Sequence, residues 1–238
     1  MTKTVSIPDS YRSRFLNIPA KLFTYFDRLL EKSSENSQFH LAMNHHPEKT
    51  FEVLDQRFLA CSKIVSLSPD DLLKKLDFQL KDLSPERIES LLGELRTINF
   101  LDNNGFTNIT PIRANSTKSP DFSAGKNGDK FLIEVATSIY FAPRTFHDSV
   151  VKWATSRVQN DDKLSQMKTD SNVYKNLFVC ILNSSGAVVL NKRSDYLKML
   201  KEIWEGVGSI QNLYIAIVTG FTTEEGQDDC VYPRFERV

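Results

Sequence analysis

The sequence predicts an α/β fold, in which helices flank a mixed central sheet and further helices precede it. Residues 176–183 and 212–219 are almost continuously apolar and have the length of strands covered on both faces. Asn127 and Gly128 stand between two shorter strand-like segments. This dipeptide is a strong hairpin signal, because both central residues of a type I′ turn need a positive φ. Apolar residues at helical spacing separate these segments.

Residues 1–83 are expected to form a helical module packed on the core. An amphipathic run begins at Pro19 and carries five apolar residues at helical spacing, namely Leu22, Phe23, Phe26, Leu29 and Leu30. A second helical pattern covers residues 48–64. A third helix is expected to follow Ser68, because proline comes next and two acidic residues stand in its first turn. Substrate recognition and dimerisation are ordinary uses of such a module.

The core is expected to begin with a helix at Ser84, which is a good N-cap followed by a proline at the first helical position. Its apolar stripe contains Ile88, Leu91, Leu92, Leu95 and Ile98. Glu94 falls against this stripe, so its carboxylate needs a metal or a basic partner. Asn104 and Gly105 end the helix, and residues 106–113 are expected to form the first strand.

The predicted hairpin sets two carboxylates side by side. If Asn127 and Gly128 are the central residues of the turn, the register places Asp121 opposite Glu134, with Cβ atoms roughly 5 Å apart. The neighbouring pair, Phe122 and Ile133, is then buried on the other face. Two ionised carboxylates repel each other, and a hard divalent cation such as Mg²⁺ relieves the repulsion. The alternative is a surface hairpin whose acids face water.

A second core helix is expected over residues 143–168, where Gln159, Lys163 and Gln166 fall on one stripe. The apolar strands at 176–183 and 212–219 then flank a helix at 192–205. From Ser84 the predicted order is therefore α-β-β-β-α-β-α-β. Residues 222–238 are expected to be a polar, mobile tail.

The region from 84 to 221 resembles the PD-(D/E)XK nuclease superfamily. The matching residues are Glu94, the dipeptide Pro120-Asp121, and Glu134-Val135-Ala136 in place of the acidic-x-Lys signature. This resemblance implies a restriction-endonuclease-like core. It also implies Mg²⁺- or Mn²⁺-dependent hydrolysis of nucleic acid phosphodiesters by activated water, with DNA favoured as substrate.

The resemblance assigns metal binding to Asp121, Glu134 and the backbone carbonyl of Val135, with Glu94 supporting the site. The chain departs from the family at Ala136, where a lysine is expected. Some families of this superfamily supply the lysine from the following helix, and the element Lys163-Leu-Ser-Gln166 looks like such a relocation.

In that case Lys163 stabilises developing charge, and Gln166 orients the lysine, water or phosphate. Lys152 on the same helix is a weaker substitute. Two rival interpretations stay open. Either Ala136 marks a nuclease-like interaction module that has lost catalysis, or the hairpin is a coincidence within an unrelated α/β scaffold.

Thirty basic and thirty acidic residues cancel, so the chain has no global positive field to attract nucleic acid. Contacts to nucleic acid must come from a local patch, and the candidates are Lys126, Lys130, Arg144, Lys152 and Arg157. Three scattered cysteines favour a reducing, cytoplasmic location, and no apolar stretch is long enough for a membrane span. A homodimer is compatible with these features. The cluster of His40, His45 and His46 is expected to lie in a surface loop and not in a metal site.

Overall fold

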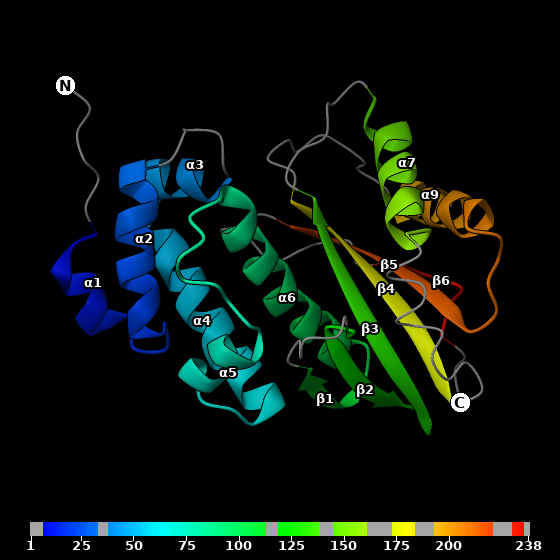
Figure 1. Ribbon diagram of the computed structural model, residues 1–238, viewed down its shortest axis with the longest axis horizontal. Coiled ribbons are helices and arrows are strands. Elements are labelled where there is room, and N and C mark those ends of the chain that lie inside the picture. The colour runs from blue at the N-terminus through cyan, green and yellow to red at the C-terminus, as the bar shows by residue number, and fades with distance from the viewer. Residues whose placement is uncertain are drawn as a thin grey trace.

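The computed structural model describes residues 7–32, 38–112, 119–138, 145–160, 173–183, 193–220 and 230–235. It is a mixed α/β structure in which helices flank a six-stranded mixed sheet. Figure 1 shows the N-terminal helices gathered on one side of the sheet and α7 and α9 on the other.

The N-terminal part is helical, as expected. The helices are α1 (Asp9–Arg14), α2 (Ala20–Lys32), α3 (Gln38–His45), α4 (Pro47–Val65) and α5 (Pro69–Lys75). Aromatic rings hold them together, with Phe51 on α4 stacked 5.4 Å from Phe23 on α2. The predicted histidine loop is wrong, because His40 and His45 belong to α3 and His46 caps α4. Pro47 starts this helix instead of ending a loop, since proline suits the first helical turn.

The strands are β1 (Thr107–Pro111), β2 (Phe122–Lys126), β3 (Asp129–Ser138), β4 (Tyr174–Asn183), β5 (Leu213–Gly220) and β6 (Cys230–Tyr232). They lie in the sheet in this order. The pairs β1–β2, β2–β3 and β5–β6 are antiparallel, whereas β3–β4 and β4–β5 are parallel. Parallel neighbours need crossover connections, and α7 (Phe146–Val158) and α9 (Arg193–Gly206) lie in these two connections.

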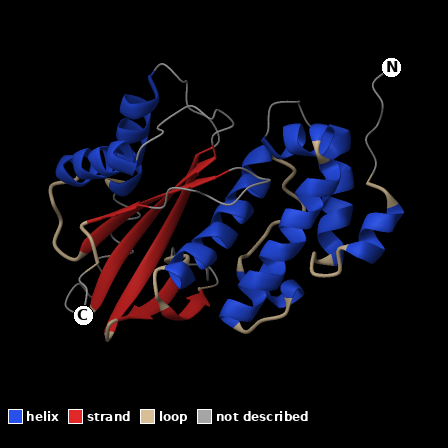
Figure 2. Cartoon of the chain, turned by 180° about the vertical axis from the view of Figure 1, so that it is seen from behind, coloured by secondary structure: helices blue, strands red, loops and turns tan. Residues whose placement is uncertain are grey.

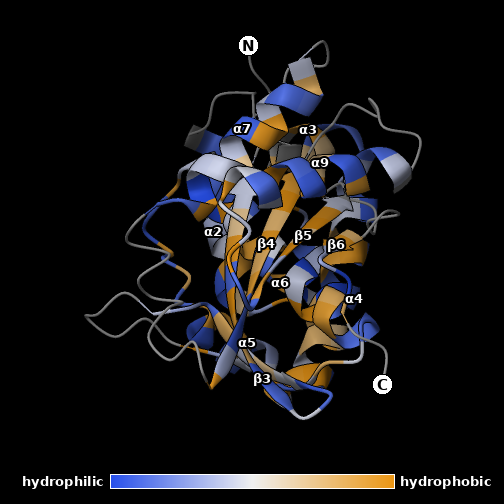
Figure 3. Cartoon of the chain, turned by 90° about the vertical axis from the view of Figure 1, so that its right-hand side faces the viewer, coloured by the Kyte–Doolittle hydropathy of each residue, from blue (hydrophilic) through white to orange (hydrophobic). Residues whose placement is uncertain are grey.

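Each face of the sheet has its own apolar core. On one face, residues such as Ile133 and Val179 pack with α6 (Pro85–Asn103) and the N-terminal helices. On the other, Phe178 and Cys180 pack with α7 and α9. Figure 2 shows helices on both sides of the strands, and Figure 3 shows the hydrophobic colouring of β4 and β5 beneath α7 and α9. Consecutive residues of β4 therefore serve opposite cores, as the long apolar run predicted.

Two boundaries differ from the predictions. The described part of the second core helix, α7, is shorter than the predicted 143–168 and ends at Val158. The C-terminal tail is not wholly without structure, because Cys230–Tyr232 pair with β5 and the Cys230 side chain is buried. Among the described helices, none is both long and apolar enough to span a bilayer.

Candidate functional site

The β2–β3 hairpin has the register that its turn residues predict. Lys126 pairs with Asp129, and the ladder continues to the pair of Phe122 and Ile133. Asn127 and Gly128 have φ values of 53° and 83°, the left-handed region that the tight turn requires. Phe122 and Ile133 are both fully buried, so the predicted inward face of the hairpin is confirmed.

The regular pairing changes at Asp121. The backbone N–H of Asp121 donates to the carbonyl oxygen of Ile133 at 3.0 Å, although Phe122 is the register partner of Ile133. Two residues of one strand thus oppose one residue of the next, which is the pattern of a β-bulge. The predicted pairing of Asp121 directly opposite Glu134 is not part of the β2–β3 ladder.

Instead, the Asp121 side chain binds the backbone of β3. The N–H of Val135 donates to Oδ2 of Asp121 at 2.7 Å. Asp121 directly precedes β2, so at Val135 the Asp121 carboxylate takes the place of a backbone partner from β2. In a strand, the N–H and C=O of one residue point to the same edge, so the Val135 carbonyl is also directed to this edge. Asp121 and Val135, two of the three predicted metal ligands, lie together here.

Glu94 reaches this region from α6. The helix approaches β3 closely at Gly93, where an added Cβ would lie 2.2 Å from Oγ1 of Thr137. Glu94 is the next residue and is half-buried. Burial raises the pKa of Glu94 well above its usual range, and the negative charge of Asp121 raises it further. The guanidinium of Arg87 acts in the opposite direction.

Glu134 is also buried, with 3% of its surface exposed. It lies beside Phe178 on β4, on the face covered by α7 and α9. Ile133 lies on the other face, which α6 covers. The negative charge of Asp121 therefore acts on Glu94, whereas Glu134 lies on the opposite face of β3.

The arrangement of Asp121, Val135 and Glu94 fits what Mg²⁺ requires, because this ion is usually bound through one or two carboxylates together with substrate phosphates. Burial is the main cause of the raised pKa of Glu94, and the charge of Asp121 is the second; a bound cation would offset the repulsion from Asp121. Within the described ranges, no three His, Cys, Asp or Glu side chains form a metal-binding group by themselves.

The predicted basic residues are dispersed. Lys126 donates a hydrogen bond to the carbonyl oxygen of Asn104 at the end of α6. Lys130 is exposed on β3, and Lys152 and Arg157 are exposed on α7. Three predicted site residues lie outside the described part of the chain, namely Arg144, Lys163 and Gln166.

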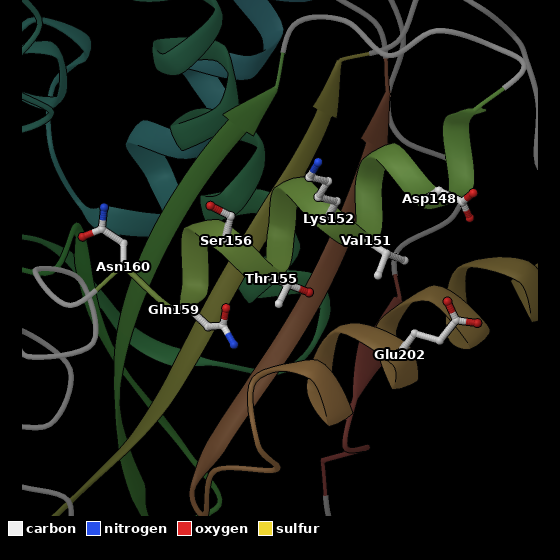
Figure 4. Close-up of a pocket in the computed structure, with 8 residues that line it drawn as sticks. All are labelled: Asp148, Val151, Lys152, Thr155, Ser156, Gln159, Asn160 and Glu202. Carbon is white, nitrogen blue, oxygen red and sulfur yellow. The ribbon is translucent and has the colours of Figure 1, made fainter.

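Lys152 also lines an open pocket of about 760 Å³ beside α7 and α9 (Figure 4). Close to the pocket, Nε2 of His147 lies 2.7 Å from Oε2 of Glu202, which itself lines the pocket. No sequence pattern predicts this pair, because its members stand 55 positions apart on different helices.

Comparisons with protein-family models, with curated proteins and with solved structures found no match to this chain.

Proposed function

We propose that the chain is a divalent-metal-dependent nuclease of the restriction-endonuclease-like fold, which hydrolyses nucleic acid phosphodiesters by activated water. The observation that carries the proposal is the hydrogen bond from the Val135 amide to the Asp121 carboxylate on β3, together with the effect of the Asp121 charge on Glu94. Carboxylate and carbonyl oxygens come together beside the first residue of β2.

The element order supports this proposal. One helix, three antiparallel strands, a second helix and a parallel strand follow one another from α6 to β4. This is the order that the resemblance to PD-(D/E)XK nucleases implies. Asp121 directly precedes the second of these strands, and Glu134 lies within the third.

In this proposal Asp121 and the Val135 carbonyl hold the cation, and Glu94 supports them directly or through water. Glu134, which the sequence predicted as a ligand, lies on the other face of β3 and is not assigned to this cation. The cation would supply charge stabilisation to the scissile phosphate and lower the pKa of the attacking water. Lys163 supplies the ammonium that the family places at the position of Ala136, and Gln166 orients it. DNA is the proposed substrate class.

A binding module without catalysis is the second candidate, and the environment of Ala136 favours it. Ala136 is 8% exposed and belongs to the apolar core beneath α7 and α9. The chain has filled this position with an apolar contact. A lysine introduced as Ala136→Lys would have to enter this core, so its effect on stability must be measured before its effect on activity is interpreted.

Calorimetric titration with Mn²⁺ tests the metal site. We expect wild type to bind Mn²⁺, Asp121→Asn to lose most of the affinity and Glu94→Gln to lose part of it, while both variants stay folded. Asp102→Asn is the matched control, because Asp102 is an exposed acid at the end of α6. Equal Mn²⁺ affinity in wild type and both site variants would exclude this metal site.

A further inference from the structure

A second polar site lies at the turn end of the β2–β3 hairpin. It is a pocket of about 80 Å³ between the hairpin, β4, β5 and the C-terminal segment. Lys126 and Lys175 line it together with Asp129, Phe131, Tyr214 and Phe235. The pocket thus combines two ammonium groups with an aromatic surface.

The aromatic surface consists of three rings in mutual contact. The ring centroid of Tyr214 lies 5.7 Å from that of Phe131 and 5.2 Å from that of Phe235. Phe131 and Phe235 are 6.0 Å apart and nearly perpendicular. Contacts of this kind fix ring orientations, so this part of the pocket is preorganised.

The two ammonium groups are held against these rings. Nζ of Lys126 lies 5.2 Å from the centroid of Phe235, and Nζ of Lys175 lies 6.0 Å from that of Tyr214. Such cation–π contacts keep a lysine amine in place without neutralising its charge. Lys126 also donates to the Asn104 carbonyl, which uses one of its three donors.

The described residues that line the pocket carry a net positive charge. Lys175 forms an ion pair with Asp129 at 2.6 Å, and Lys126 adds a second cation. Two ammonium groups and one carboxylate leave one positive charge. The volume of about 80 Å³ corresponds to two or three water molecules at roughly 30 Å³ each. This is the space that a small tetrahedral oxyanion needs.

We propose that this pocket binds a phosphate group. The group can belong to free phosphate or to a nucleic acid backbone, and the backbone source rests on the nuclease function proposed above. Val135 lies six positions after Asp129 on β3, which is about 20 Å at a strand rise of about 3.3 Å per residue. A duplex with a rise of about 3.4 Å per step covers this distance in about six base pairs. One nucleic acid could therefore contact both sites.

Calorimetric titration with inorganic phosphate at constant ionic strength tests the pocket. We expect wild type to bind phosphate, and Lys175→Gln and Lys126→Gln to bind it about tenfold more weakly or worse, as for a lost charge-assisted hydrogen bond. Lys63→Gln is the matched control, since Lys63 is an exposed lysine on α4 that does not line the pocket. Its phosphate affinity should equal that of wild type.

A variant that removes a negative charge keeps the test decisive if a lysine variant folds poorly. Among the described residues that line the pocket, Asp129 supplies the carboxylate, and Asp129→Asn removes this charge while keeping a residue that suits a place beside the turn. We therefore expect it to bind phosphate more tightly than wild type. Absence of phosphate binding by wild type, or equal affinity in wild type, Lys175→Gln and Asp129→Asn, would overturn the proposal.

Fluorescence anisotropy with a labelled DNA oligonucleotide distinguishes the two sources. If the source is the nucleic acid backbone, Lys126→Gln and Lys175→Gln each weaken DNA binding and reduce the slope of log affinity against log salt by about 1. If only the affinity for inorganic phosphate falls, the source is a free phosphate. Mn²⁺ binding at Asp121 should be unchanged in Lys175→Gln, so failure of this pocket and failure of the metal site are separate results.

Discussion

Glu94 holds a carboxyl group in a place where its ionisation is unfavourable. Burial is the main cause of its raised pKa, and the charge of Asp121 is the second. A group whose pKa is raised by folding contributes stability that is fully present below its unfolded pKa and is lost as the pH rises through the raised value. The ionised carboxylate therefore destabilises the folded protein at neutral pH, unless a cation compensates.

Glu94→Gln should therefore stabilise the metal-free protein at pH 7.5. We expect the melting temperature to rise by about 2–4 °C, the shift that about 1 kcal/mol produces in a domain of this size. The gain should disappear as the pH falls below the ordinary pKa range of glutamate. Glu94 is then protonated, and therefore uncharged like glutamine, in both the folded and the unfolded protein. Differential scanning calorimetry without divalent cations, from pH 4 to pH 8, measures this difference.

Glu86→Gln serves as the control, because Glu86 is an exposed carboxylate on the same helix. Glu86→Gln should change the melting temperature only slightly, and this change should not grow as the pH rises above the ordinary pKa range of glutamate. A lower melting temperature of Glu94→Gln at pH 7.5 would contradict the assignment of an unfavourable charge to Glu94. It would instead indicate that the ionised carboxylate has a strong cationic partner.

The contact between α6 and β3 sets the position of Glu94. Gly93 allows this contact, since an added Cβ would lie 2.2 Å from Oγ1 of Thr137 and 3.3 Å from Cγ1 of Ile181. The distance of 2.2 Å to Oγ1 of Thr137 is shorter than any that real Cβ atoms show. The neighbouring atoms belong to stiff, β-branched side chains, so they cannot move aside without changing the packing.

Gly93→Ala should accordingly lower the free energy of unfolding by about 1–3 kcal/mol, the usual cost of overpacking. This loss is expected even though alanine favours a helix interior by about 1 kcal/mol over glycine. Urea unfolding measures the change. The double variant Gly93→Ala with Thr137→Ala should recover part of the loss, because it removes Oγ1. Equal stability of Gly93→Ala and wild type would mean that α6 does not approach β3 so closely.

The hairpin was predictable because its signals are local. Asn127 and Gly128 determine the turn, and the turn determines every pair out to Phe122 and Ile133. The bulge at Asp121 was not predictable, since the residue leaves the ladder to bind the Val135 amide through its side chain. A rule based on strand register contains no information about such a side-chain bond.

Features that depend on residues far apart in the sequence were predicted less well, because local patterns contain no information about them. The element order followed from periodicity, but α1 and α3 are short and carry weak patterns. The three residues of β6 have no strand signal of their own, and pairing with β5 defines them. The aromatic pocket at the hairpin end also escaped prediction, because Lys175, Tyr214 and Phe235 come from distant parts of the sequence.

The C-terminal segment completes one edge of the sheet and the core beneath it. Cys230 is buried against the α7 and α9 side, and Tyr232 lies 5.6 Å from Trp204 on α9. Phe235 packs on the opposite side, 5.3 Å from Phe106. The segment therefore contributes to both apolar cores and covers the edge of β5.

Deletion of residues 229–238 should destabilise the whole molecule. We expect a loss of about 3 kcal/mol or more, comparable to the removal of one large aromatic side chain from a core. The uncovered edge of β5 should also promote aggregation. Urea unfolding and light scattering measure the two effects, with Arg234→Ala as the control because Arg234 is exposed. Unchanged stability after the deletion would contradict the role given to β6.

Single-turnover cleavage is the most direct test of a metal-dependent nuclease. Wild type is incubated in excess over labelled single- and double-stranded DNA and RNA with Mn²⁺, beside Asp121→Asn and Lys163→Ala. We expect wild type to cleave DNA and Asp121→Asn to be inactive. Lys163→Ala should be slower by about 10²–10³-fold or more, the usual effect of removing one preorganised charge contact. Absence of cleavage by wild type, in a sample that binds Mn²⁺ at Asp121, would contradict the enzyme and leave the binding module.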